Sequence, residues 1–139
     1  MEIIANALQT VQSNQNVYFT DAITCGNCAI THRDGSGLVT LRGLTTQCRA
    51  RFKVTFGGNI AIPTGGTVEP ISLALSLDGE PILATTMIFT PAAVEQFGNV
   101  FAAVFIDVPH GCCQTIGVRN TSTQAIEVQN ANLIVERTS

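Results

Sequence analysis

Strict alternation of apolar and polar residues is the feature of this sequence that most restricts its fold. Between Cys48 and Phe56 every second residue is apolar, and the residues between them are basic or threonine. A period of two places all the apolar residues on one face of a β-strand. The segment Ile71–Leu77 alternates in the same way and precedes Asp78-Gly79, a frequent hairpin turn. Both segments are predicted to be strands with one buried face.

Turn-forming residues recur along the whole chain at short intervals. They are Asp34-Gly35-Ser36-Gly37, Gly57-Gly58, Pro63-Thr64-Gly65-Gly66, Asp78-Gly79 and Pro109-His110-Gly111. Short strands separated by such turns predict an all-β fold, an antiparallel jelly-roll sandwich of about ten short strands. One helical turn is expected from Thr90 to Gly98, with Thr90 as its N-cap and Pro91 in its first position.

The remaining strands are predicted from apolar pairs and the turns between them. A strand from Pro81 to Phe89 is expected to return beside Ile71–Leu77. The turn Asn120–Thr123 separates two further apolar segments. These two segments contain Ile116 with Val118 and Ile126 with Val128, and a last strand contains Leu133 and Val135. No internal repeat or linker divides the chain.

Charge and hydropathy limit the partners of this chain. Only 12% of its residues are charged and its net charge is −3, whereas proteins that bind nucleic-acid backbones carry clusters of Lys and Arg. The longest apolar run, Val100–Ile106, is far shorter than the roughly 20 residues of a membrane-spanning helix. Glu2 stands where a secretory signal carries basic residues. We therefore expect no nucleic-acid partner, no membrane span and no signal peptide, and synthesis in a cytoplasm.

One predicted strand, within Phe97–Val108, is apolar on both faces. Its even-numbered positions from Val100 to Val108 form one apolar face, and Phe101, Ala103 and Phe105 make the opposite face apolar as well. A sheet with one solvated side needs only one apolar face. The second face is therefore covered either by another layer of the same chain or by an identical subunit, and the short chain favours the subunit.

The cysteines permit several kinds of chemistry. They are Cys25, Cys28, Cys48, Cys112 and Cys113. The two-residue gap between Cys25 and Cys28 matches zinc knuckles and thioredoxin-type redox sites, and a zinc site could combine them with Cys112 and either Cys113 or His110. The sequence has no second pair of cysteines with the two-residue spacing of a zinc site, and no strand-to-helix unit follows Cys28. We therefore favour reduced thiols over a disulfide, and a disulfide over a metal, and expect no cofactor.

No arrangement of residues favours an enzyme. The G-x-S-x-G sequence of serine hydrolases does not occur, and His32 lies in a polar turn segment. The acids that might pair for glycoside chemistry are Asp21, Asp34, Asp78 and Asp107. Asp34 and Asp78 belong to turn sequences, where their side chains usually bond to nearby backbone. We expect no catalytic residues.

The segment Val108–Arg137 resembles the C-terminal end of small jelly-roll domains of Firmicutes and their phages. That family is related to the tumour-necrosis-factor-like and complement-globular-head fold. The segments Thr31–Leu41, Arg49–Phe56 and Ile71–Gly79 fall where that fold has strands, so the resemblance covers nearly the whole chain. It implies a homotrimer in which one sheet of each subunit packs about a threefold axis. The interface residues it implies are Val17, Phe19, Phe101, Phe105, Leu133 and Val135.

The same resemblance implies a structural role. Spore-surface members of the family carry a collagen-like stalk, and no Gly-X-Y repeat occurs here. We therefore expect a bacteriophage virion protein, a head decoration or short head fibre on the capsid. Residues 1–10 would dock to the major capsid protein or a neighbouring virion protein through Ile3, Ile4 and Leu8, and residues 11–139 would form the jelly roll.

Two alternatives to the virion role remain open at this point. The first is a trimeric protein of the bacterial spore surface. The second is a carbohydrate-binding adhesion module, which makes a host-surface glycan a further candidate partner. The many Asn, Gln and Thr residues suit sugar recognition, but the sequence has no Trp and one Tyr, Tyr18, to serve as aromatic platforms.

Overall fold

The computed structural model describes residues 1–24, 30–32, 35–42, 49–109 and 113–138. These residues form twelve strands and one short 3-10 helix. In chain order the elements are β1 (Glu2–Ala5), β2 (Gln9–Val11), β3 (Asp21–Thr24), β4 (Ile30–His32), β5 (Leu38–Arg42), β6 (Arg49–Ala61), β7 (Ile71–Leu77), β8 (Glu80–Pro81), the 3-10 helix (Leu83–Thr85), β9 (Met87–Phe89), β10 (Gly98–Pro109), β11 (Cys113–Asn120) and β12 (Ile126–Arg137). No helix among them is long and apolar enough to cross a membrane.

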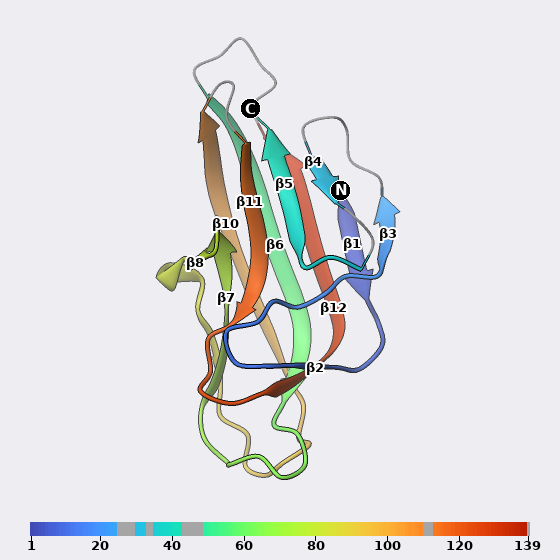
Figure 1. Ribbon diagram of the computed structural model, residues 1–139, viewed down its shortest axis with the longest axis vertical. Helices are drawn as coiled ribbons and strands as arrows, with labels where there is room; N and C mark the ends of the chain where they lie inside the picture. Colours follow the sequence, from blue (N-terminus) through green and yellow to red (C-terminus); the bar gives the residue numbers. More distant parts are fainter. Residues whose placement is uncertain (25–29, 33–34, 43–48, 110–112, 139) are drawn as a thin grey trace.

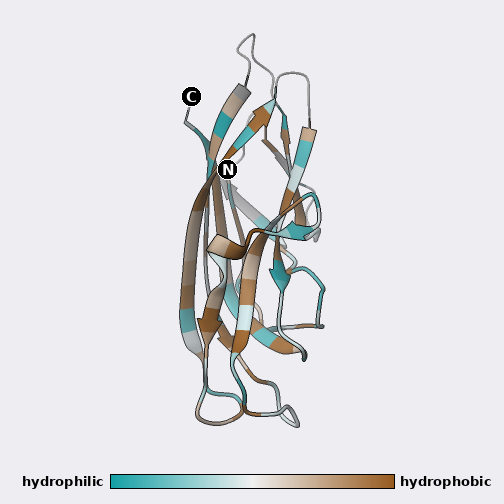
Figure 2. Ribbon diagram, turned by 90° about the vertical axis from the view of Figure 1, so that its left-hand side faces the viewer, coloured by the Kyte–Doolittle hydropathy of each residue, from teal (hydrophilic) through white to brown (hydrophobic). Residues whose placement is uncertain are grey.

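The strands are arranged in two antiparallel sheets that pack face to face (Figures 1 and 2). The first, called the β6 sheet, has the order β10-β6-β12-β1-β3, and β2 also pairs with β12. The second, called the β7 sheet, has the order β4-β5-β11-β7-β8, and β9 also pairs with β7. Strands distant in sequence are thus neighbours, as in a jelly roll. The predicted fold class is confirmed, although β6, β10 and β12 are each at least 12 residues long rather than short.

Alternation along β6 and β7 places the core between the two sheets. Ala50, Phe52, Val54 and Phe56 on the inner face of β6 are all fully buried, as predicted. The Phe56 ring meets the Phe19 ring edge to face, with ring centroids 6.5 Å apart. Further fully or almost fully buried side chains are Leu41, Ile60, Ile71, Leu73, Leu75, Ile116, Val118 and Ile126.

The hairpin between β7 and β8 confirms the turn predicted at Asp78-Gly79. Both residues have positive φ, 51° for Asp78 and 89° for Gly79, which is the conformation of a type I′ turn. The Asp78 carboxylate accepts a 2.9 Å hydrogen bond from the backbone N–H of Thr115 on β11. The turn is therefore bonded to its neighbouring strand.

The helical turn predicted at Thr90–Gly98 is wrong. Glu95 has a φ of 61°, which a right-handed helix does not contain, and its N–H bonds to the carbonyl of Ile62 at 2.7 Å. The helical turn lies instead at Leu83–Thr85, inside the segment predicted as one strand. Thr85 is buried there, and its Oγ1 accepts a 3.0 Å hydrogen bond from the Leu75 N–H. That contact divides the predicted return strand into β8 and β9.

Residues 9–19 cross from one sheet to the other. β2 pairs with β12 of the β6 sheet, whereas Asn16 forms an isolated bridge with Arg119 of the β7 sheet. Asn14 has a φ of 65°, and the Gln15 N–H bonds to the Gln12 carbonyl at 3.0 Å, which closes a turn between the two pairings.

Asn120 is a fully buried polar residue that joins three segments near this crossing. Its Nδ2 donates to the carbonyls of Val11 (2.9 Å) and Gln124 (3.0 Å), and its Oδ1 accepts from the Ser122 N–H (2.9 Å). The amide thus holds β2 against the turn between β11 and β12. A buried amide with these partners restricts the chain path as well as stabilising it.

We expect Asn120→Ala to lower the free energy of unfolding by about 2–4 kcal/mol, because each buried group that loses its partner costs roughly 1–3 kcal/mol. Urea denaturation followed by circular dichroism measures the change. Asn99→Ala is the matched control, since the exposed Asn99 amide bonds to the half-buried Asn59 side chain. It should change the stability by less than about 0.5 kcal/mol. Equal effects of the two substitutions would contradict this role for Asn120.

Residues 1–10 belong to the sandwich, so the predicted boundary after residue 10 is wrong. β1 pairs with β12 on one side and with β3 on the other. Ile3 is fully buried, and the N-terminal amine donates to the Val135 carbonyl at 2.6 Å. The strand at the N-terminus is therefore an interior strand of the β6 sheet and not a separate segment.

Candidate functional site

The outer face of β10 carries exposed aromatic side chains. Phe101 is 65% and Phe105 60% exposed, and Ala103 between them is also exposed. On the inner face, Val100, Ile106 and Val108 are buried. The prediction that this strand is apolar on both sides is confirmed, and no layer of the described chain covers the second side. Solvent-exposed phenylalanines this close together are unusual on a chain that acts alone.

The apolar surface continues from β10 across the two neighbouring strands. The strand register places Phe101 opposite Gly57 and Ala103 opposite Thr55 on β6, and Thr55 opposite Ile134 on β12. Ile134 is 38% exposed. A Cβ added at Gly57 would meet no atom within 4 Å, so the surface beside Phe101 is open. We call this surface the apolar stripe; its residues are Phe101, Ala103, Phe105, Thr55, Gly57 and Ile134.

Polar and charged residues border the apolar stripe. Beyond Phe105, the Arg51 guanidinium donates from Nε and Nη2 to the two carboxylate oxygens of Asp107, at 2.9 and 3.2 Å. This hydrogen bond and the negative charge of Asp107 raise the pKa of Arg51, so Arg51 keeps its charge. The β6–β12 register places Lys53 opposite Glu136. An apolar centre with a charged border is the usual composition of a protein–protein contact surface.

Four of the six predicted interface residues do not lie on this surface. Val17, Phe19, Leu133 and Val135 are all 0–1% exposed, inside the core of their own chain. Strand parity explains the two on β12, because the odd-numbered positions there point inward. Val17 bonds through its N–H to the Val118 carbonyl, which places it beside the opposite sheet. These four are corrected to core residues, and Phe101 and Phe105 alone have exposed side chains.

The three predicted docking residues do not share one surface. Ile3 is buried in the core, which excludes it from contact with another protein. Ile4 is half-buried on the outer face of β1, and Leu8, between β1 and β2, is 52% exposed. The structure therefore gives no common docking surface to these residues.

Most of the predicted cysteine chemistry falls outside the described residues. Cys25, Cys28, Cys48, Cys112 and His110 lie outside the described residues. Cys113, at the start of β11, is exposed and has a free thiol. Within the described part of the chain, no group of three His, Cys, Asp or Glu side chains is close enough to hold a metal ion.

His32 also lies within the fold rather than in a turn. It is the last residue of β4, its ring meets Phe19 edge to face at 6.4 Å, and its Nε2 lies 3.0 Å from the Ser36 carbonyl oxygen. The ring therefore packs beside the aromatic core and bonds to nearby backbone.

Ile134 and Gly57 are the members of the apolar stripe that sequence reasoning missed. The available signal was a change of parity along β12. Its buried apolar residues are even-numbered at Ile126 and Val128 but odd-numbered from Ala131 onward. The register shifts between Gln129 and Asn132, and Asn130 has a φ of 56°, which is the geometry of a β-bulge. A bulge at this point places Ile134 on the outer face.

Comparison with known proteins assigns the fold and no more. No family model matches the chain, and no curated protein sequence matches it. The globular domain of zebrafish complement 1qA protein superposes with a TM-score of 0.64 and 12% identity, over 96% of this chain and 93% of that one. The chain thus has the jelly-roll fold of a complement globular head, as the sequence resemblance implied.

Two sugar-related domains are less similar. The C-terminal domain of EclA, a sugar-binding protein, gives a TM-score of 0.44 and 14% identity over 95% of this chain and 79% of that chain. A family 35 carbohydrate-binding module from Clostridium thermocellum gives 0.35 and 10% over 92% and 98%. The assignment of the fold therefore depends on the complement domain, with its TM-score of 0.64.

Proposed function

We propose that this chain is a non-enzymatic structural domain that assembles as a homotrimer through the apolar stripe and is displayed on a bacteriophage particle, as a head decoration or short head fibre. The observation that carries the proposal is the exposure of Phe101 and Phe105 on the outer face of a strand whose inner face already contributes to the core. The complement-type jelly-roll fold is compatible with a non-catalytic binding or structural domain.

The hydrophobic effect provides the driving force for assembly. Removing a phenylalanine side chain from water contributes about 1.5–3 kcal/mol, and each subunit would bury two. Ile134 and Thr55 extend the contact across the sheet, and Gly57 leaves room for a side chain of the neighbouring subunit. The Arg51–Asp107 pair at the border would fix the orientation of the subunits more than their affinity.

The particle on which the domain is displayed is proposed from the sequence resemblance to small phage and spore-surface jelly rolls. A major capsid protein or a neighbouring virion protein would be its attachment partner. With Ile3 in the core, attachment would use a surface other than the N-terminal strand.

Quantitative mass spectrometry of purified virions and purified spores of the same host tests the location. We expect peptides of this chain in the virion fraction. Because the proposed unit is a trimer, the number of copies per virion should be a multiple of three. Detection in spores alone would replace the virion with the spore surface. Detection in neither fraction would contradict display on a particle.

A further inference from the structure

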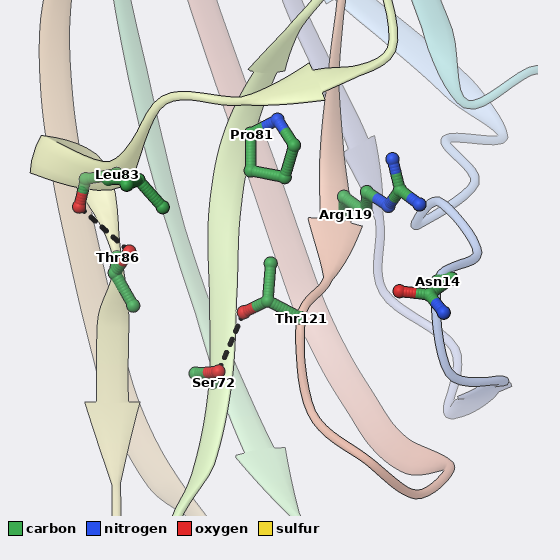
Figure 3. A pocket seen from close by; sticks show the side chains of 7 residues that line it. All are labelled: Asn14, Ser72, Pro81, Leu83, Thr86, Arg119 and Thr121. Atoms are coloured by element: carbon green, nitrogen blue, oxygen red, sulfur yellow. Dashed lines mark hydrogen bonds between the residues drawn. The ribbon is translucent and has the colours of Figure 1, made fainter.

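A cleft of mixed apolar and polar lining lies on the outer face of the β7 sheet, on the opposite side of the sandwich from the apolar stripe. Its volume is about 460 Å³, within the roughly 300–1,000 Å³ of small-ligand sites. Ser72 on β7 and Thr121 after β11 form its floor (Figure 3). Arg119 and Asn14 lie on one side of this floor, and Leu83 and Thr86 lie on the other.

Arg119 gives the cleft a positive charge. One of its Nη1 hydrogens bonds to the Gly79 carbonyl at 2.6 Å, which anchors the side chain to the β7–β8 turn. Its Nε is buried and has no hydrogen-bond partner among the described residues, and no carboxylate there pairs with the guanidinium. A half-buried arginine anchored in this way presents its remaining Nη hydrogens to an anion, and a carboxylate can accept two guanidinium hydrogen bonds at once.

The other lining groups suit a polyhydroxylated ligand. The Ser72 and Thr121 hydroxyls share one hydrogen bond of 2.6 Å, and the Thr86 hydroxyl donates to the Leu83 carbonyl at 2.8 Å. Each of these oxygens keeps capacity to accept a further hydrogen bond. The Leu83 side chain is 81% exposed and provides an apolar surface against which the C–H face of a sugar ring can pack.

A second cleft, also lined by described residues, lacks such a charge. It has a volume of about 380 Å³, is lined by residues around Thr64 and Gln124, and contains no charged side chain. The cleft beside Arg119 thus combines a cation, several hydroxyls and an exposed apolar side chain, whereas the other offers neutral polar groups and backbone.

We propose that the Arg119 cleft binds a carboxylated sugar, such as a uronic or sialic acid residue of a glycan. The carboxylate would bind the Arg119 guanidinium, ring hydroxyls would bond to Ser72, Thr121 and Thr86, and the ring would pack on Leu83. The site is independent of trimer assembly, because it occupies the outer face of the other sheet. It gives a displayed structural domain the capacity to contact an acidic glycan.

Titrations followed by NMR test the site with four probes: glucuronate, N-acetylneuraminate, glucose and acetate. We expect at least one of the two acidic sugars to shift the amide signals of Ser72 and Thr121 and to bind about tenfold or more tightly than glucose or acetate. Acetate binding as tightly as the acidic sugars would reduce the cleft to a simple anion site. Glucose binding equally well would show that the charge is unused. Either outcome, or no binding at all, would overturn the proposal.

Three variants test whether the acidic sugar binds in the Arg119 cleft. Arg119→Ala should weaken binding of the acidic sugar about tenfold or more, whereas Arg42→Ala, on exposed Arg42 of β5, should leave it unchanged. Because Arg119 also anchors a turn, Leu83→Ala provides a second test on a side chain that does not contribute to the core. It should weaken sugar binding and leave the weak binding of acetate unaffected. Unchanged sugar binding in both Arg119→Ala and Leu83→Ala would contradict this placement.

Discussion

The double variant Phe101→Asp/Phe105→Asp is expected to be a folded monomer of about 14.7 kDa at concentrations where we expect the unmodified protein to form the proposed trimer. Each substitution removes about 1.5–3 kcal/mol of apolar burial from every subunit. It also places a carboxylate in an apolar contact, where a charge without a partner costs several kcal/mol more. Because each 1.4 kcal/mol changes an equilibrium constant about tenfold, the combined loss abolishes assembly.

The fold of a single chain should tolerate both substitutions. The two phenylalanine side chains are 65% and 60% exposed, so their removal leaves no cavity in the core. Aspartate is unfavourable in a strand, and a cost of about 1 kcal/mol in stability is expected. Far-UV circular dichroism verifies folding, and light scattering measures the mass.

A matched control is available on the other sheet. Ile88 on β9 is 67% exposed, and Ile88→Asp introduces the same charge into a similarly exposed apolar position. It should leave the mass of the assembly unchanged. If the Phe101/Phe105 double variant remains a trimer, or if Ile88→Asp dissociates the assembly equally, the apolar stripe is not the subunit interface.

Deletion of residues 1–6 is expected to abolish cooperative folding. It removes β1 from between β12 and β3 and leaves both neighbouring strands without their backbone partners. It also removes Ile3, which is fully buried. Truncation of one such side chain to alanine costs about 2–5 kcal/mol, a large share of the roughly 5–15 kcal/mol by which domains are stable.

Urea denaturation followed by circular dichroism tests this expectation. The deletion variant should show no cooperative transition, and Ile3→Ala should keep one with a stability lower by about 2–5 kcal/mol. Ile4→Ala is the matched control, because Ile4 is the adjacent residue on the outer face and is only half-buried. A deletion variant with an unchanged midpoint would show that residues 1–10 are a separable segment, as the sequence alone had indicated.

Much of the fold follows from local patterns in the sequence. β6 was predictable because its alternation is strict and the core covers only one of its faces. β7 was predictable from the same alternation, although Ala74 and Ser76 on its other face are buried as well. The type I′ turn at Asp78-Gly79 was predictable because few residue pairs accept two positive φ angles. The two apolar faces of β10 were predictable in the same way, because apolar residues occupy both even- and odd-numbered positions of this strand. These features depend on near neighbours in the sequence, and that is why the sequence alone was sufficient for them.

Features that depend on contacts between distant residues were not predictable in this way. The crossing between β2 and Asn16 depends on the buried Asn120 amide, more than 100 residues away. The inward parity of Leu133 depends on a bulge opposite β6. The place of β1 depends on its pairing with β12, at the other end of the chain. Of the six residues predicted for an interface, Phe101 and Phe105 are exposed, and the interface itself stays a prediction. The other four are buried, because contacts with distant residues fix their orientation.

The mass of the unmodified protein in solution tests the central claim most directly. Light scattering at micromolar concentration, in reducing buffer and again with a chelator, should give about three times 14.7 kDa in both conditions. An apolar interface requires neither a disulfide nor a metal, so neither reagent should change the mass. A monomer at every concentration, or an assembly that dissociates with reductant or chelator, would contradict assembly through the apolar stripe.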